Sequence, residues 1–405
     1  MSTTSIVPYL PSRRVRCTGQ RPKEDQTAII ELVPKASVRP ICSGCNGPAD
    51  RVHSSYTRSI RDLSFGEHRI TLQLQQRRLR CDRCGAVRAE AHDFVELSAR
   101  VTNRLAAYAA ALCKVLPLLD VSRHLDLDWK LVKRCDKAAL DREFAGTDTT
   151  GLRLLAVDEI ALKKGQQRYM TVVFDYVSGR VVWMGEGHGF ETLSAFFLQM
   201  SPEEREGIQA VAMDMWDPFV KAVRHHLPRA RIVYDLFHVV KAYHQEVIDV
   251  VRQDAYRKTH DQEERRFIKG SRFLLYKKLE NLSEKQRPRL DELLRVNEDI
   301  ATVHVLRDSL KRIWQCRSPW EARRELRNWC RLATESAIPA LIKFAKRLRR
   351  REHGIVTHAC FQINTSVLEG VNHRIKQIKR RSYGFQDPEY FALKVKQAFP
   401  GKACT

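Results

Sequence analysis

The sequence predicts a multidomain α+β protein, and three observations lead to that prediction. The chain has 405 residues, more than a single hydrophobic core usually serves, and 43% of them are apolar, which indicates folded domains. Two C-x2-C pairs stand in the N-terminal quarter of the chain. The apolar spacing then changes from strand-like to helical, and afterwards to a mixed pattern. We therefore expect successive domains of different structural class.

The charge of the chain favours a polyanionic partner. Lysine and arginine number 71 against 48 acidic residues, so the net charge is +23. Nucleic acid is the commonest partner of so basic a protein, although ribosomal and membrane-surface proteins are basic too. No apolar run approaches the roughly 20 residues that span a bilayer, and Pro8, Pro11, Arg13 and Arg14 interrupt any leader-like stretch. We expect a cytoplasmic protein without a membrane partner, whose cysteines are thiols or metal ligands.

Changes of pattern along the chain predict six segments. They are an irregular N-terminal segment (1–38), a cysteine-rich segment (39–95), a helical segment (96–148), a mixed α/β core (151–256), a helical insertion (257–355) and a C-terminal helical region that completes the core (356–400). In the core, apolar runs predict strands at 152–157, 169–174, 180–184, 208–213 and 232–234, with helices at 191–200 and 218–226. The pattern of residues 236–353 is almost wholly helical.

The two cysteine pairs predict a structural zinc site. Thiolates two residues apart can bind one Zn²⁺ from a tight turn, and two such turns complete a tetrahedron. The ligands would be Cys42, Cys45, Cys81 and Cys84. The 35 residues between the pairs (46 to 80) favour a zinc ribbon with an extended insert, whose strands fall within 58–80. Chance pairing and a redox motif are the alternatives, but a redox motif needs only one pair beside a βαβ unit.

The helical segment predicts a helix-turn-helix. One short helix is expected near 114–124, and a second begins after Asp128, a suitable N-cap. An apolar stripe on the second helix leaves its other face to meet phosphates and base edges of DNA. The DNA-binding residues predicted there are Trp129, Lys130, Lys133, Arg134 and Lys137. An ordinary amphipathic helix with a solvated basic face is the alternative.

Three aspartates each follow an apolar run of the mixed core. Asp158, Asp214 and Asp235 stand where strands are expected to end, and acidic residues are disfavoured inside strands. Any one of them could simply start a turn, but together they suggest a metal site on a ribonuclease-H-like sheet. Two carboxylates about 4 Å apart repel by roughly 4 kcal/mol at an effective dielectric near 20. Such a site needs cations, and two Mg²⁺ (or Mn²⁺) ions suit oxygen ligands and an in-line displacement at phosphorus.

A further carboxylate is expected from a later helix. Glu369 stands one helical turn before Asn372 and His373, so the three share a face. The basic residues that follow are predicted to bind DNA: Arg374, Lys376, Lys379, Arg380 and Arg381. A carboxylate within so basic a helix suits a residue that holds metal beside a phosphate backbone. The alternative is a surface glutamate that offsets its cationic neighbours.

Four strings follow the cysteine pairs in order: AVDEI, AVAMDMWDPF, YDLFHVVK and NTSVLEGVNHRIKQIKRRSYGF. Together they resemble the ISL-three-type insertion-sequence transposases, bacterial enzymes with a zinc ribbon, a helix-turn-helix and a DDE catalytic domain. The resemblance covers about residues 39–395. It implies that Asp158, Asp214 and Glu369 bind the catalytic metals, and that Asp235 and His238 form a D-x-x-H motif that shapes the site.

The resemblance also implies an activity and partners. The enzyme would bind the terminal inverted repeats of its element, cut double-stranded DNA with Mg²⁺ and transfer the freed end to target DNA. It would be associated with the nucleoid and act as a homodimer or larger assembly, because two ends must be joined. One of Trp314, Trp320 and Trp329 could stack on an unpaired base. A DNA-binding regulator that has lost cutting and a junction-cutting nuclease on the same fold are the alternatives.

Overall fold

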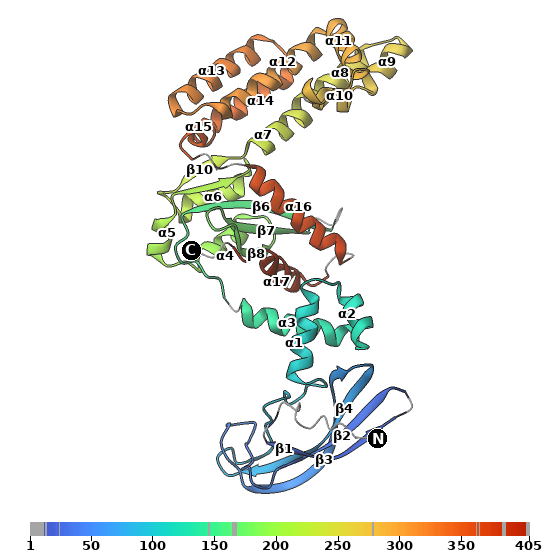
Figure 1. The fold of residues 1–405 in the computed structure, drawn as a ribbon. Helices are drawn as coiled ribbons and strands as arrows, with labels where there is room; N and C mark the ends of the chain where they lie inside the picture. Colours follow the sequence, from blue (N-terminus) through green and yellow to red (C-terminus); the bar gives the residue numbers. More distant parts are fainter. Residues whose placement is uncertain are drawn as a thin grey trace. The chain divides into compact units, whose positions relative to one another are not determined.

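The computed structural model describes residues 12, 14–23, 25–144, 146–163, 168–277, 279–361, 363, 365–382 and 386–401. The chain divides into two compact units, Met1–Ala145 and Gly146–Thr405, which are taken separately below (Figure 1). Within the described ranges, no helix has the length and apolar character that crossing a membrane requires.

The first unit begins with a five-stranded sheet. Its order is β1-β2-β4-β3, and β5 pairs with the end of β4. β2 and β4 run parallel, whereas the other neighbours are antiparallel. The strands are β1 Val15–Pro22, β2 Thr27–Pro34, β3 Arg51–Phe65, β4 His68–Cys81 and β5 Ala86–Ala89.

The prediction that residues 1–38 are irregular is wrong where the structure describes them, since β1 and β2 form a hairpin there. Ile30 and Leu32 of β2 pack into the same core as Leu72 and Leu74 of β4. The signal was weak because β1 is an edge strand that buries only Val15. Residues 1–11, which belong to the same predicted segment, lie outside the described part.

Three helices follow in the same unit: α1 Asn103–Cys113, α2 Leu118–Leu125 and α3 Trp129–Glu143. The side chain of Asp128 accepts hydrogen bonds from the backbone N–H groups of Lys130 (2.9 Å) and Leu131 (3.3 Å), which confirms its predicted role as N-cap. α2 begins later than the predicted residue 114, because Pro117 disfavours helical backbone at the residue before it.

The second unit is built on a five-stranded mixed sheet of order β10-β9-β6-β7-β8. β6, β7 and β8 form an antiparallel meander, and β9 and β10 run parallel to β6. The strands are β6 Leu154–Lys163, β7 Arg168–Asp175, β8 Arg180–Glu186, β9 Ala210–Met213 and β10 Arg231–Tyr234. All five predicted strands are confirmed.

Helices cover both faces of this sheet. α4 and α6 pack on one face, which carries Leu155 and Val157. α16 and α17 pack on the opposite face, which carries Ala156. These helices, with the short α5 on the connection to β9, are α4 Phe190–Phe197, α5 Pro202–Gly207, α6 Asp217–His226, α16 Thr365–Arg381 and α17 Pro388–Ala398. The sheet thus lies between two helical layers.

A helical region is inserted between β10 and α16. It begins at Leu236, so the predicted boundary at 257 is too late: the first helices after β10 pack against a helix deep in the insertion, Glu298–Arg312. Its helices are α7 Leu236–Tyr243, η2 His244–Ile248 (a π-helical turn), α8 Asp249–Lys258, α9 Gln262–Lys269, α10 Arg272–Tyr276, α11 Gln286–Val296, α12 Glu298–Arg312, α13 Pro319–Glu335, α14 Pro339–Arg350 and α15 Glu352–Val356.

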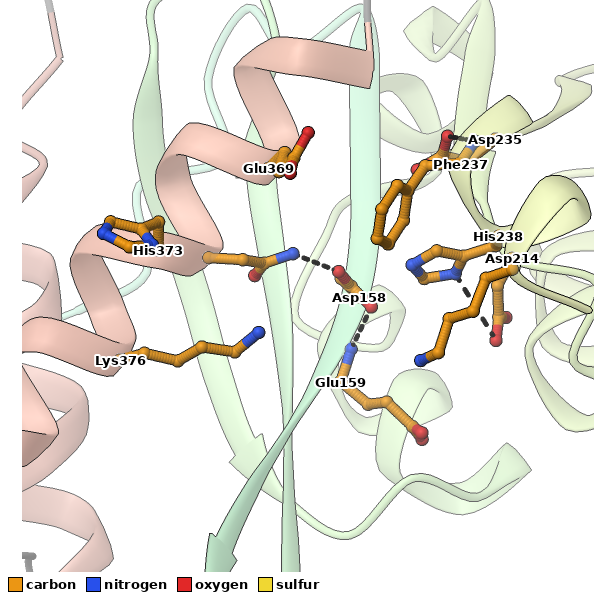
Figure 2. Close-up of a pocket in the computed structure, with 11 residues that line it drawn as sticks. Asp158, Glu159, Asp214, Asp235, Phe237, His238, Glu369, His373 and Lys376 are labelled. Atoms are coloured by element: carbon orange, nitrogen blue, oxygen red, sulfur yellow. Dashed lines mark hydrogen bonds and ion pairs between the residues drawn. The ribbon is translucent and has the colours of Figure 1, made fainter. Parts of the chain in front are cut away.

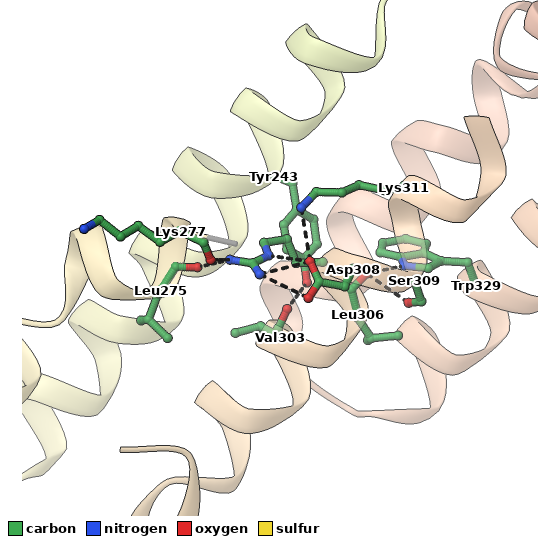
Figure 3. A network of polar contacts seen from close by, with 10 residues as sticks. Tyr243, Leu275, Lys277, Val303, Leu306, Asp308, Ser309, Lys311 and Trp329 are labelled. Carbon is green, nitrogen blue, oxygen red and sulfur yellow. Dashed lines mark hydrogen bonds and ion pairs between the residues drawn. The ribbon is translucent and has the colours of Figure 1, made fainter. Parts of the chain in front are cut away.

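Buried polar contacts fasten these helices together (Figure 3). The hydroxyl of Tyr243 in α7 donates to the carbonyl of Val303 (2.7 Å), and the indole N–H of Trp329 in α13 donates to that of Leu306 (2.8 Å). Arg307, which is fully buried, donates to the carbonyl of Lys277 at 3.0 Å. Each bond satisfies a group whose burial without a partner would cost about 1–3 kcal/mol. The insertion is therefore held by specific contacts as well as by apolar packing.

Candidate functional site

An acidic cavity of about 260 Å³ lies at one edge of the mixed sheet (Figure 2). The residues that line it come from β6, the ends of β9 and β10, α7 and α16. They are Asp158, Glu159, Asp214, Asp235, Phe237, His238, Lys241, Glu369, Asn372, His373 and Lys376. The predicted triad and both members of the predicted D-x-x-H motif are thus found in one pocket.

Strand pairing explains why the three aspartates meet. β9 and β10 are paired up to Met213 and Tyr234, so Asp214 and Asp235 follow directly at the same edge. β6 pairs with β9 only as far as Ala156, so Asp158 lies just beyond the parallel pairing. The expectation that Asp158 ends its strand is wrong, because β7 continues to pair with β6 and Asp158 faces Val172.

Backbone N–H groups fix the orientation of these carboxylates. Asp158 accepts from Glu159 at 2.7 Å, Asp214 from Trp216 at 3.0 Å and Asp235 from Phe237 at 2.7 Å. The last bond also caps α7, which carries His238. The imidazole Nδ1 of His238 lies 3.9 Å from a carboxylate oxygen of Asp214. Each of the three aspartates is therefore oriented by a backbone N–H group one or two residues farther along the chain.

Glu369 and Asn372 approach from α16, one helical turn apart. The side-chain amide of Asn372 donates to Asp158, and farther along the helix the ammonium of Lys379 donates to the carbonyl of Ala161 at 2.7 Å. Glu369 itself is exposed at the mouth of the cavity. These two bonds join α16 to β6 along the edge that carries the acidic cavity.

Burial in the cavity disfavours the charged form of its carboxyl groups. It raises the pKa of Asp214 and the pKa of Asp235, and in both cases the nearby His238 opposes the rise. Burial, followed by the charge of Asp214, raises the pKa of Glu159. Oxygen ligands crowded in this way suit a hard divalent cation such as Mg²⁺.

The sequence did not reveal three residues of the cavity: Glu159, Phe237 and Lys241. Adjacent residues of a strand normally point to opposite faces, so Asp158 gave no reason to expect Glu159 beside it. Phe237 and Lys241 flank His238 on α7, and the position of Lys241 one turn after His238 is a helical signal that could have found it.

The basic residues predicted to bind DNA on α16 have different environments in the structure. Lys376 lines the cavity, and half-buried Lys379 is bonded to β6. Arg380 and Arg381 are exposed, as is Arg374, whose guanidinium lies 5.4 Å from the ring centre of Phe399. Lys376 therefore belongs to the site, Lys379 joins α16 to β6 outside the cavity lining, and the three arginines lie on the surface.

On α3, the predicted DNA-binding face is partly exposed. Trp129, Lys130 and Arg134 are exposed, and the ammonium of Lys130 lies 5.8 Å from the ring centre of Trp129. Lys133 and Lys137 are half-buried. Positions 130, 133, 134 and 137 follow helical spacing, so the four cations share one side of the helix.

The four cysteines of the two pairs form a compact cluster. Their sulfur atoms all lie within 4.8 Å of one another, with 3.8 Å between Cys42 and Cys84 and 3.6 Å between Cys45 and Cys81. A tetrahedral ion with Zn–S bonds of about 2.3 Å separates its sulfur ligands by roughly 3.8 Å, so the cluster fits zinc. Burial raises the pKa of Cys42, but N–H groups of Gly44 and Cys45 and the neighbouring thiols outweigh it and bring that pKa to about 7.

The three tryptophans of the insertion differ in environment. Trp314 and Trp329 are buried, whereas Trp320 is 68% exposed and the guanidinium of Arg324 lies 5.0 Å from its ring centre. Core packing therefore accounts for two of them and leaves Trp320 on the surface.

Comparison with known families agrees with this arrangement. A family model described as a transposase matches residues 155–395. A zinc-finger model of the IS204/IS1001/IS1096/IS1165 transposases matches residues 39–84, and a helix-turn-helix model of transposase family ISL3 matches residues 90–139. The cysteine cluster, the helices α1 to α3 and the mixed-sheet unit with its acidic cavity thus fall within the three matched domains of a transposase of the insertion-sequence class.

The chain belongs to the ISL3 family of these transposases, as its motifs predict. It is 44% identical over 379 residues to the transposase for insertion sequence element IS1001 of Bordetella parapertussis, which covers 93% of each chain. It is 26% identical over 395 residues to the transposase for IS1557 of Mycobacterium tuberculosis, covering 89% of this chain and 86% of that relative.

Proposed function

We propose that this transposase is a DDE enzyme that cuts DNA at the ends of its element and joins the freed ends to target DNA. The observation that carries the proposal is the meeting of Asp158, Asp214 and Glu369 in one cavity. They come from β6, the end of β9 and α16, which are far apart in the chain. A meander followed by two parallel strands is also the sheet expected of a ribonuclease-H-like core, and this supports the same reading.

The donor set favours two Mg²⁺ (or Mn²⁺) ions, held by Asp158, Asp214 and Glu369. Bound divalent ions would supply activation of the attacking oxygen and stabilisation of the leaving oxygen in an in-line displacement. Asn372 would keep the carboxylate of Asp158 in its orientation, and His238 would do so for Asp214. Lys241 and Lys376 offer cationic groups to the oxygens of the DNA phosphate.

The reaction consists of two phosphoryl transfers. A water oxygen attacks phosphorus at the element end, and its proton passes to solvent. The bond to the 3′ oxygen breaks and that oxygen takes up a proton from solvent, which leaves a 3′-hydroxyl and a 5′-phosphate. The 3′-hydroxyl then attacks a phosphodiester of the target, so one ester bond forms as another breaks. No covalent intermediate with the protein is needed.

Recognition of the terminal inverted repeats is assigned to the first unit. The zinc cluster would hold the fold of the ribbon, and α3 would present Lys130 and Arg134 to DNA in the manner of a recognition helix. Both element ends must be held together while they are joined to the target, so the active form is proposed to be a homodimer or a larger assembly. The same DNA partner fits a nucleoid-associated protein of the bacterial cytoplasm.

The decisive experiment is incubation of the purified protein with Mg²⁺ and DNA that carries both element ends. We expect 3′-hydroxyl ends at the element boundary and, with target plasmid present, strand-transfer products. Binding of the ends without any cutting would favour the alternative, a DNA-binding regulator. Cutting of branched junctions without end joining would favour a junction nuclease.

A further inference from the structure

Three aromatic rings form a row beside the acidic cavity. They belong to Tyr169 of β7, His188 in the turn after β8 and Trp216 in the turn after β9. The ring centres of Tyr169 and His188 are 4.3 Å apart, and those of His188 and Trp216 are 5.6 Å apart. The rings of His188 and Trp216 are stacked, with 23° between their planes. None of the three residues packs in a hydrophobic core cluster among the described residues.

The orientation of Trp216 is fixed by two hydrogen bonds. Its indole N–H donates to the carbonyl of His188 at 2.8 Å. Its backbone N–H donates to the carboxylate of Asp214 at 3.0 Å. The indole bond holds the ring beside His188, and the backbone bond holds the turn beside the carboxylate of Asp214. The ring therefore cannot rotate away from the row without breaking the indole bond.

The turn that carries His188 is equally constrained. The backbone N–H of Gly187 donates to the carbonyl of Tyr169 at 2.8 Å, and the hydroxyl of buried Thr171 donates to the carbonyl of Gly187 at 2.8 Å. Gly187 has φ +102°, and a Cβ there would meet the hydroxyl of Thr192 at 2.4 Å, so only glycine fits. The row is thus preformed rather than assembled by a ligand.

The row is accessible and reaches the cavity. Trp216 is 41% exposed although its indole is large and apolar. Trp216 lies two residues after Asp214, which lines the cavity, and its backbone N–H is bonded to that carboxylate, so the row adjoins the cavity. Phe237, which is 45% exposed, adds another aromatic face to the cavity lining.

We propose that the row of Trp216, His188 and Tyr169 binds an unpaired nucleobase next to the phosphodiester that enters the cavity. Aromatic side chains bind unpaired bases by stacking, and such binding tolerates any sequence because every base has a π-face. A base within a duplex is covered by its neighbours, so only an unpaired or extruded base can use the row. This inference rests on the proposed function, which supplies the DNA substrate.

The test uses the full-length protein and a duplex with a single-stranded 3′ extension that contains the fluorescent base 2-aminopurine, without added divalent metal. Stacking on an aromatic ring quenches this base. We expect quenching by the wild type, and a loss of quenching with roughly five- to a hundredfold weaker binding of the extension for Trp216→Ala. Trp216→Phe, which keeps an aromatic ring but lacks the indole N–H, should retain part of the quenching.

The matched control is Phe273→Ala on α10, which removes another aromatic side chain that is 71% exposed. Phe273→Ala should bind and quench like the wild type, and blunt duplex should bind equally to all variants. Unchanged quenching and affinity in Trp216→Ala, with wild-type cutting intact, would overturn this inference and leave the proposed function standing. If the wild type cuts no DNA yet quenches the base through Trp216, the proposed function fails and the row stands.

Discussion

The side-chain amide of Asn372 donates a hydrogen bond to the carboxylate of Asp158, and this contact joins helix α16 to strand β6 at the acidic cavity. Asn372 is one helical turn from Glu369, so the same bond that orients one proposed metal ligand also positions the helix that carries another. Helix α16 and strand β6, which carry two members of the proposed triad, are thereby connected through a residue outside the triad.

Asn372→Ala should slow DNA cutting while leaving DNA binding unchanged. Without the amide, the side chain of Asp158 keeps only the bond from the N–H of Glu159 and can rotate. Loss of a residue that orients a metal ligand typically costs about 10- to 100-fold in activity or metal affinity. Single-turnover cutting at several Mg²⁺ concentrations measures both. Gln377→Ala, at an exposed position of the same helix, is the control and should cut normally.

Asp214→Ala should abolish cutting and leave end binding largely intact. The side chain lies in the cavity, and the loss of a metal ligand removes several kcal/mol of transition-state stabilisation, which is roughly a thousandfold or more in rate. Cutting assays and gel-shift titrations with element-end DNA separate the two effects. Asp254→Ala, an exposed aspartate of α8, should change neither. Equal losses of binding and cutting by Asp214→Ala would contradict the assignment.

The elements predicted well are those with a strong local signal. Spacing alone predicts the zinc ligands Cys42, Cys45, Cys81 and Cys84. The buried strands that precede Asp214 and Asp235 predict these two aspartates. The position of Glu369 in the sequence does not show that it lies in the same cavity as the aspartates, because that depends on how α16 packs across the sheet. That step came from the family resemblance and not from periodicity.

The features that the sequence missed depend on tertiary structure. The hairpin of β1 and β2 was overlooked because an edge strand buries few side chains and so shows little alternation. Tyr169, His188 and Trp216 lie on separate strand ends, and only the sheet order brings their rings together. Their individual positions carry no recognisable spacing.

Cys42→Ser or Cys81→Ser should release zinc and weaken specific DNA binding. Both thiols are buried in the cluster, and a hydroxyl is a far poorer zinc ligand than a thiolate. Elemental measurement should find about one zinc per wild-type chain and little in either variant. Cys360→Ser, which alters an exposed thiol outside the cluster, should keep its zinc. Unchanged zinc in Cys42→Ser would refute the metal site.

Lys130→Ala and Arg134→Ala should weaken DNA binding and reduce its dependence on salt. Both side chains are exposed on the same side of α3. Each cation that neutralises a phosphate contributes about one unit to the slope of log affinity against log salt, so each variant should lower the slope by roughly one. Titrations at several salt concentrations provide the slope. Arg21→Ala is the control, because Arg21 of β1 is paired with Glu31 of β2. A slope unaltered in both α3 variants would rule out a phosphate contact there.

Acidification should destabilise the helical insertion through His304. Burial, together with the nearby Arg307, lowers the pKa of this histidine to about 4; Asp308 raises it slightly and Lys311 lowers it further. The folded-state pKa lies below the unfolded value near 6.5, so between these pH values the unfolded chain binds more protons and stability falls as the pH falls. The full stability is present above the unfolded pKa near 6.5, and between pH 7.5 and pH 5 the loss should be roughly 1–2 kcal/mol.

Calorimetric unfolding of the wild type and of His304→Gln at pH 7.5 and pH 5 measures this effect. The glutamine variant removes the titrating ring, so its melting temperature should drop less between the two pH values, whatever its stability at pH 7.5. His260→Gln, which alters an exposed histidine, should keep the wild-type drop. The idea fails if His304→Gln and the wild type lose the same stability, because the acid sensitivity would then arise from other groups.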